Sequence, residues 1–448
     1  MTLSPSQQPV TFRPLASALR RLPHALHMAL MVFYRLSSAI SGILVFSICM
    51  RNYGAGSVGK YAYTVALCQI IAPLLVGGVD PILVRELVRR PNDRLDLLGS
   101  AFLLVLGTTV VTAGIPVVYA WLTESRDPSI FYMALGLSVG LLPNCGLVLM
   151  SLFRAESRIT LVAVCGLTGV VVCAIVRVAL VLLGKPLYYV TAATILEPLL
   201  TVVMLLAAYR RRYGSPFAWQ VSRESMRTLF ELSWPAVLSS FIVNLFFRTT
   251  HLMLQALSTF EQLGYYAIAF QMFTVLNFIP NSVLAVVYPR LVDLHRKNAG
   301  RYLESVRTTY VAVTLTGLAI CVAVWLWAEP VVTLVFGAKS APAAPVAVAM
   351  AVANLFAFSG SVRGQVIYIE HKPIYHVYNA LLGFVALIPL NFVLIPQWGA
   401  VGAALSVAAA CLVSGVASSW VFPRLRSTGI DQTLAFFAIR RRLVRAPA

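Results

Sequence analysis

The sequence predicts an all-α, polytopic integral membrane protein with 12 transmembrane helices, arranged as two six-helix bundles related by pseudo-two-fold symmetry. Hydrophobic residues make up 59% of the 448 positions and charged residues only 11%, which is too apolar for a set of soluble domains. The apolar residues are also gathered into segments long enough to cross a bilayer. The net charge of +19 would suggest a nucleic-acid partner in a soluble protein, but basic cytoplasmic loops produce the same total.

Each apolar segment supplies the 20 or so residues that a helix needs to cross the hydrocarbon core at about 1.5 Å per residue. Residues 1–25 form a polar tail without the apolar core and cleavage site of a signal peptide. A basic linker, 210–228, separates the two halves, 26–209 and 229–424. The tail 425–448 mixes aromatic and aliphatic residues with arginines, which favours a position on the anionic inner leaflet. The predicted spans are 26–50, 58–82, 97–122, 129–153, 159–183, 187–209, 229–257, 262–289, 302–328, 343–369, 373–395 and 399–422.

The distribution of Lys and Arg predicts the orientation. The tails and the even-numbered connections hold 25 of the 35 basic residues, whereas the odd-numbered connections hold 5. Because basic residues are retained on the cytoplasmic side, both termini are predicted to be cytoplasmic. This bias also explains the net charge without nucleic acid.

The two halves resemble a duplication. Gly59-Lys-Tyr61-Ala62 opens the second segment and Gly264-Tyr-Tyr266-Ala267 opens the eighth, at an offset of 205, and Arg85 and Arg290 close these segments at the same offset. Glu156-Ser-Arg158 and Glu370-His-Lys372 match at an offset of 214. Six helices per half make the repeats parallel, related by an axis along the membrane normal. Two such bundles can rock against each other and expose a central path to each side in turn, as in a transporter.

The seventh segment carries a polar stripe. Ser240, Asn244, Arg248, His251 and Gln255 are spaced 4, 4, 3 and 4 apart, so they share one face of a helix. An ionisable group deep in hydrocarbon is costly unless it is solvated or paired. The stripe therefore lines a substrate path, with Arg248 as its cation, or forms a hydrogen-bonded seam between helices.

Other ionisable residues within the segments are candidates for the same path or for ion coupling. Arg35, Arg177 and Arg363 are further cations that could bind an anionic substrate or extend outward to the interface. Glu197 is the best intramembrane acid, either a proton relay or a partner of a neighbouring Arg. His251 could carry a proton or only accept and donate hydrogen bonds. The seven cysteines are isolated in apolar surroundings, so packing is predicted for them, with no metal site, disulfide or cofactor.

Short motifs along nearly the whole chain resemble the polysaccharide-transporter branch of the multidrug/oligosaccharidyl-lipid/polysaccharide exporter superfamily, the Wzx-type O-antigen and exopolysaccharide flippases. The motifs are Tyr53-Gly54 through Gly59-Lys60-Tyr61, Val84-Arg85-Glu86, Leu232-Ser-Trp234-Pro235, Gly264-Tyr-Tyr266-Ala267, Tyr288-Pro289-Arg290, Phe336-Gly337, Asn391 through Pro396, and Gly399 through Ala404. The resemblance implies transfer of a polyprenyl-diphosphate-linked oligosaccharide across the bacterial inner membrane by alternating access, coupled to an ion gradient. It also implies membrane lipids, a polysaccharide polymerase and chain-length-control proteins as partners. Family members often carry an Asp near the middle of the seventh helix, where this chain has Arg248-Thr-Thr250-His251.

Two alternatives remain open at this stage, and a third is disfavoured. A multidrug or small-cation antiporter would share the fold, but its cavity is expected to be lined by carboxylates rather than arginines. A scaffold subunit of a glycan-assembly complex would tolerate the loss of Arg248. An enzyme is disfavoured because no connection carries a paired-carboxylate or Ser/His/Asp set. No dimer surface is evident, so a monomer is predicted.

Overall fold

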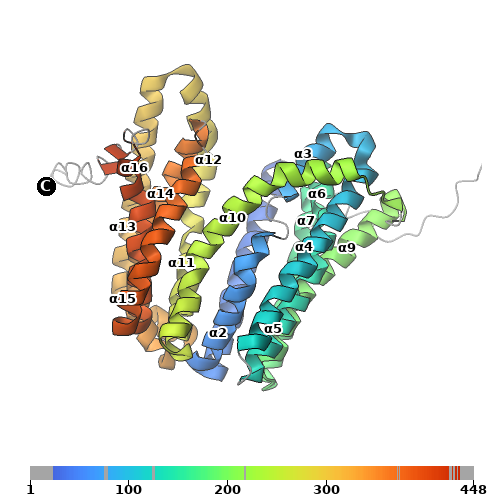
Figure 1. Ribbon diagram of the computed structural model, residues 1–448. Coiled ribbons are helices and arrows are strands. Elements are labelled where there is room, and N and C mark those ends of the chain that lie inside the picture. Colours follow the sequence, from blue (N-terminus) through green and yellow to red (C-terminus); the bar gives the residue numbers. More distant parts are fainter. Residues whose placement is uncertain are drawn as a thin grey trace, which may run out of the picture.

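In the computed structural model the described part of the chain is helical and contains no strand. The structure describes residues 24–74, 79–123, 127–215, 218–370, 372, 374–422, 426, 429–430 and 432–433, without the side chains of 24–29, 31, 32, 35, 236, 239 and 299. The predicted roles of the tails 1–25 and 425–448 therefore lie almost wholly outside the described residues. The helices form two groups, joined by the long helix α10 (Figure 1).

The N-terminal bundle is made of α2 (His24–Ile71), α3 (Val79–Arg89), α4 (Arg94–Thr123), α5 (Pro128–Val139), α6 (Val148–Ala155), α7 (Ile159–Leu182), α8 (Leu187–Ala192) and α9 (Leu196–Tyr213). The C-terminal bundle is made of α11 (Phe260–Leu276), α12 (Phe278–Lys297), α13 (Ala299–Phe336), α14 (Ala344–Ile369), α15 (Ile374–Leu412) and α16 (Ser418–Val421). Between them, α10 (Arg223–Leu257) contacts α3 and α4 of the first bundle and α11 and α15 of the second.

The described helices account for all twelve predicted crossings. Nine helical runs are long and apolar enough to span a membrane, and α10 makes a tenth span that bends by 50° between Pro235 and Ser240. Two of the nine runs, Leu36–Arg89 with 54 residues and Ile374–Val421 with 48, are too long for one crossing. At about 1.5 Å per residue each would reach more than twice the thickness of the hydrocarbon core. Each run contains one reversal and is a pair of spans.

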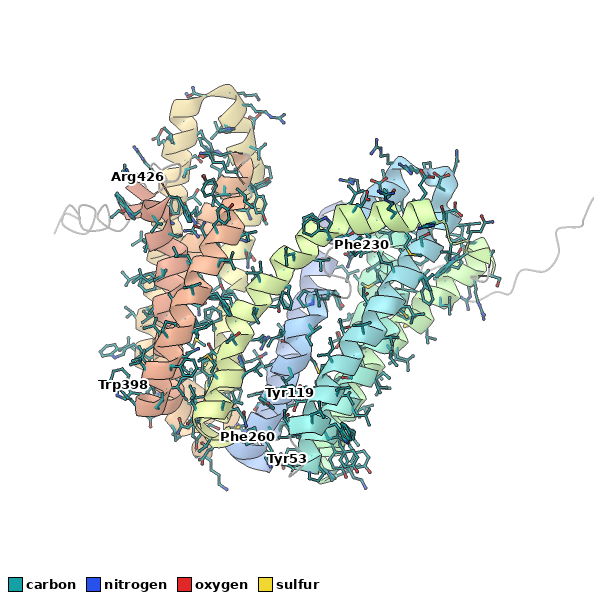
Figure 2. All side chains as sticks on the ribbon, in the orientation of Figure 1. Tyr53, Tyr119, Phe230, Phe260, Trp398 and Arg426 are labelled. Carbon is teal, nitrogen blue, oxygen red and sulfur yellow. The ribbon has the colours of Figure 1, made fainter. Side chains whose placement is uncertain are left out.

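A glycine with positive φ makes each reversal. Gly54 has φ 77° within α2 and Gly399 has φ 54° within α15, in the left-handed region that other residues adopt at a cost. A Cβ added at Gly402 would lie 2.0 Å from the carbonyl oxygen of Leu394, eight residues earlier, so the chain has turned back on itself. Tyr53 and Trp398, each in the middle of its helix in sequence, both lie at one end of the molecule (Figure 2).

Proline interrupts other spans. The fourth span consists of α5, a 3-10 segment at Leu142–Leu147 that contains Pro143, and α6. In α10 the bend begins at Pro235, which cannot donate a backbone hydrogen bond to the preceding turn. The predicted seventh span, 229–257, is therefore a bent helix rather than a straight one.

The two bundles converge at the end that carries Tyr53, Phe260 and Trp398, and they diverge toward the end that carries Phe230 and Arg426 (Figure 2). The converging end holds the odd-numbered connections, and the charge bias assigns it to the side of the membrane opposite the cytoplasm. Closest contact is made by the repeated glycines. A Cβ at Gly59 would lie 1.8 Å from the carbonyl oxygen of Phe260, and one at Gly264 would lie 2.1 Å from that of Ala55. The duplicated motif thus forms a reciprocal crossing of α2 and α11.

Arg51 and Ser47 add polar contacts to this closed end. The Arg51 guanidinium donates to the carbonyl oxygen of Val335, 3.2 Å from Nε and 3.1 Å from Nη2, and to that of Leu334. The Ser47 hydroxyl also donates to Val335. These carbonyls lie in the last turn of α13, where unpaired backbone acceptors attract a cation. The N-terminal bundle therefore caps a helix of the C-terminal bundle.

Candidate functional site

Arg248 is the cation at the centre of the polar stripe on α10. Its side chain is half-buried, and its guanidinium carbon lies 4.7 Å from the centre of the Phe270 ring on α11. No carboxylate or hydrogen-bond acceptor among the described residues pairs with it. A cation over an aromatic face keeps its N–H donors free for an acidic ligand.

The other residues of the stripe have different surroundings. Asn244 donates to the carbonyl oxygen of Ser240 at 3.0 Å, within the same helix, and Gln255 is half-buried. His251 is only 1% exposed and packs edge-to-face against Tyr266 and Phe270, with ring centroids 4.9 and 4.8 Å away. Its Nδ1 has no hydrogen-bond partner within the described chain. The packing favours a structural role for His251, and its predicted role in proton transfer stays a prediction.

Arg363 lies inside the C-terminal bundle. It is 4% exposed, and its Nη1 donates to the carbonyl oxygen of Gly415 at 3.1 Å and to the hydroxyl groups of Ser418 and Ser419 at 2.6 and 3.3 Å. Nη2 donates to the carbonyl oxygen of Ser414. Both carbonyls belong to a π-helical turn at Val413–Ala417. Since the guanidinium completes the hydrogen bonding of this turn, little of it is left for a substrate.

Arg177 and Glu197 lie together within the N-terminal bundle. Arg177 on α7 donates from Nη2 to the Tyr61 hydroxyl at 3.1 Å, and Glu197 on α9 is half-buried. Within the described residues no ion pair joins Glu197 to an arginine within 4.0 Å, so the neighbouring-Arg partner and the proton relay both stay predictions for Glu197. The side chain of Arg35 lies outside the described residues, although its backbone belongs to α2.

The partners of several ionic contacts could not be predicted from the sequence. Asp80 accepts from Arg154 and Ser151, at 2.5 Å each, and ties α3 to α6. Glu86 is 2% exposed and pairs with Arg85 at 3.1 Å. Asp80 lies within the predicted span 58–82, and Arg85 and Glu86 belong to a motif of the resemblance, but neither pattern indicates which side chains these carboxylates contact. Among the described residues no group of three His, Cys, Asp or Glu side chains could hold a metal ion.

Residues 56–345, well over half of the chain, match the family model described as "Polysaccharide biosynthesis protein". The chain belongs to this family. No curated protein matches the chain.

Solved structures show the fold of this polysaccharide biosynthesis protein. The lipid II flippase MurJ in an inward closed conformation superposes with a TM-score of 0.64 at 12% identity, covering 94% of each chain. A multidrug resistance MATE transporter of the MOP superfamily in an inward-facing conformation gives 0.65 at 12% identity, covering 93% of this chain and 96% of that one. An outward-facing conformation gives 0.57 at 15% identity, covering 90% and 93%. The predicted membrane-transporter fold is confirmed.

Proposed function

We propose that this chain moves a polyprenyl-diphosphate-linked oligosaccharide, an O-antigen or exopolysaccharide repeat unit, from the cytoplasmic to the periplasmic leaflet of the bacterial inner membrane. The bundles rock about their crossing and expose the path to each side in turn. The family match and the similarity to a lipid II flippase support a lipid-linked glycan as cargo. An ion gradient supplies the driving force.

The observation that carries this proposal is the unpaired guanidinium of Arg248 on the helix that joins the bundles. A diphosphate must lose much of its hydration within the membrane, and guanidinium groups replace it with bidentate, charge-assisted hydrogen bonds. Asn244 and Gln255 on the same face can donate to sugar hydroxyls or phosphate. Arg177, Arg35 and Arg363 are secondary candidates for substrate contact, with Arg363 the least available because of its bonds to the π-helical turn.

Replacing Arg248 by alanine is expected to remove surface glycan and to accumulate the lipid-linked intermediate at normal protein level. Loss of charged hydrogen bonds costs about 2 kcal/mol, so transport should fall roughly 30-fold. Arg248→Lys should retain part of the activity, because it keeps the charge without the bidentate geometry. The measurement is glycan display and intermediate level in a deletion strain complemented with each variant.

Arg227→Ala is the matched control on the same helix. The Arg227 side chain is 79% exposed and paired with Glu231, outside the membrane core, so its loss should leave transport unchanged. Full activity of Arg248→Ala would refute the proposed path and favour a scaffold role. If glycan display were unaffected but resistance to cationic drugs changed, the multidrug antiporter would be the better assignment, which the MATE-like fold also allows.

Glu197→Gln is expected to uncouple transport from the ion gradient. In the proposed coupling Glu197 exchanges a proton beside Arg177, and glutamine cannot do so. Transport should fall at least tenfold, to the rate that the wild type shows when the gradient is collapsed by an ionophore. If the variant instead kept its gradient dependence and lost only folded protein, Glu197 would be a structural partner of Arg177. His251→Asn tests the second proposed proton carrier in the same assay.

We expect the transporter to be a monomer, with one copy of the chain forming the whole transport path. A polysaccharide polymerase and chain-length-control proteins are the expected partners on the product side, because a flipped repeat unit must be joined to others before it is useful. Co-purification of such proteins with the full chain, compared with the Arg248→Ala variant, checks these contacts.

A further inference from the structure

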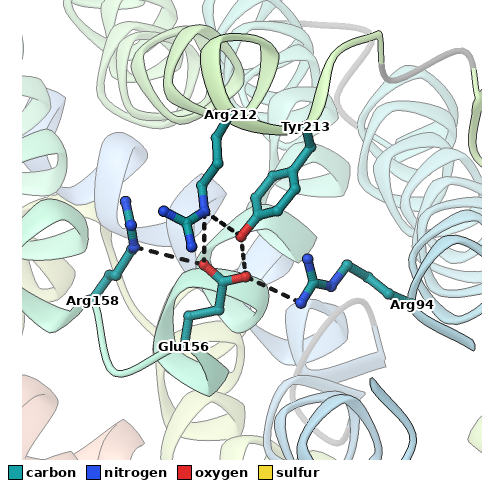
Figure 3. A network of polar contacts seen from close by, with 5 residues as sticks. All are labelled: Arg94, Glu156, Arg158, Arg212 and Tyr213. Carbon is teal, nitrogen blue, oxygen red and sulfur yellow. Dashed lines mark hydrogen bonds and ion pairs between the residues drawn. The ribbon is translucent and has the colours of Figure 1, made fainter. Parts of the chain in front are cut away.

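A carboxylate at the cytoplasmic end of the N-terminal bundle gathers three arginines and a tyrosine. We call Glu156, Arg94, Arg158, Arg212 and Tyr213 the Glu156 cluster (Figure 3). Glu156 lies 3.3 Å from Arg94 Nη2, 3.7 Å from Arg158 Nε and 3.8 Å from Arg212 Nε. The Tyr213 hydroxyl donates to Glu156 and accepts from Arg212 Nε at 2.6 Å. The cluster joins the beginnings of α4 and α7 to the ends of α6 and α9.

The positive charge of the cluster exceeds what one carboxylate can neutralise. Three guanidinium groups face one carboxylate, and two of the three ion pairs are longer than a hydrogen bond. The Nη groups of Arg158 point away from Glu156 (Figure 3). No residue of the described chain accepts a hydrogen bond from the Nη groups of Arg158 or Arg212, whose side chains are 30% and 43% exposed. Donors therefore remain for a further anion.

The cluster lies at the depth of lipid headgroups. All five residues fall within three positions of the end of a membrane span, at the end assigned to the cytoplasm by charge. The inner leaflet carries anionic lipids, and basic sites between transmembrane helices at this depth can bind their phosphates. The helices that bear the cluster pack against one another within the N-terminal bundle. The Glu156 cluster is thus separate from the path proposed for the glycan lipid.

The second repeat provides an internal comparison. Glu370, which matches Glu156 in the duplication, has one described ion partner, Lys372, at 2.8 Å. A carboxylate needs only one cation to be neutralised, so two of the three arginines around Glu156 exceed that need. The number of arginines around Glu156 therefore needs an explanation other than holding the helix ends together.

We propose that Arg94, Arg158 and Arg212 bind the phosphodiester of an acidic phospholipid in the cytoplasmic leaflet, with Glu156 neutralising only part of their charge. Two guanidinium groups can each give two hydrogen bonds to one phosphate. The lipid would anchor the N-terminal bundle in the leaflet while the other bundle moves. This site is independent of the glycan and of its transport.

The test uses the purified full chain in nanodiscs of phosphatidylglycerol or phosphatidylcholine, with lipid retention measured by native mass spectrometry and stability by thermal unfolding. The wild type should retain phosphatidylglycerol and gain stability from it. Arg158→Gln combined with Arg212→Gln should weaken retention about tenfold, as expected for loss of about 1.4 kcal/mol. Lys372→Gln, at the matching place in the second repeat, is the control and should retain lipid as the wild type does.

Two further measurements separate the alternatives. Glu156→Gln leaves the three cations without a competing carboxylate, so lipid retention should stay at the wild-type level or rise. Loss of retention as large as in the double arginine variant would overturn the proposal, because the arginines would then serve only Glu156. Equal protection by inorganic phosphate in phosphatidylcholine, with no added effect of phosphatidylglycerol, would assign the site to soluble phosphate and overturn the lipid.

Discussion

Replacing Gly59 by leucine is expected to abolish transport, because the converging end of the two bundles could no longer close. A Cβ at this position would lie 1.8 Å from the carbonyl oxygen and 2.7 Å from the carbonyl carbon of Phe260. Both are backbone atoms in the first turn of α11, which cannot move aside as a side chain can. The bundles would have to separate along their tightest contact. Gly264→Leu should behave in the same way, because its Cβ would meet the backbone of Ala55 at 2.1 Å.

Separation of the bundles can be read at Ser47, which is 9% exposed and contacts Val335 of the opposite bundle. A cysteine placed there should react with a membrane-impermeant maleimide in the Gly59→Leu background and stay protected in the wild-type background. Gly56→Leu is the control on the same segment, since a Cβ added at Gly56 would have no neighbouring atom within 4 Å, and this variant should remain active and protected.

A milder variant keeps the test valid if Gly59→Leu fails to insert. Arg51→Gln removes the guanidinium that caps the end of α13 without adding bulk, so labelling at Ser47 should rise several-fold while the protein level stays normal. Unchanged labelling in both variants would show that this crossing does not close the converging end.

Arg363→Ala is expected to lower the stability of the C-terminal bundle by about 3 kcal/mol, since it removes a buried charged donor from two carbonyls and two hydroxyl groups. The carbonyls of Ser414 and Gly415 lose the guanidinium and keep only neutral side-chain donors, Ser418 Oγ at 2.8 Å and Gln432 Nε2 at 3.0 Å. The folded fraction after membrane extraction should fall several-fold, and unfolding in detergent should occur at lower temperature. Both are measured by fluorescence-detected size exclusion after heating.

The conservative variants decide between a structural role and a substrate contact for Arg363. Arg363→Lys keeps the charge but has fewer donors in a different geometry, so it should recover stability only in part. Arg363→Met removes the buried charge and fills similar volume, and it should be less destabilising than alanine. Normal stability of Arg363→Ala together with lost transport would contradict the structural role and make Arg363 part of the substrate path.

The number of spans and the duplication follow from the sequence because both depend on local properties. Apolar length alone marks a membrane crossing, and basic residues mark the side of each connection. The same locality explains why the stripe of Arg248 could be predicted, since residues three and four apart on a helix share a face. The repeated glycine, Gly59 and Gly264, is also evident in the sequence, but the close crossing of α2 and α11 that requires it is not.

Only the tertiary structure decided which partner each of these faces meets. Arg363 bonds to residues about 50 positions away, and Arg51 bonds to residues more than 280 positions away. His251 and Arg248 lie on one stripe, yet the first is enclosed by aromatic rings and the second is half-buried beside one. The sequence by itself determined a twelve-span, duplicated membrane protein with a cation on its seventh helix. Whether an arginine is hydrogen-bonded to backbone carbonyls or remains available to bind an anion depends on the packing of helices that are distant in the chain. Helical periodicity carries no information about that packing.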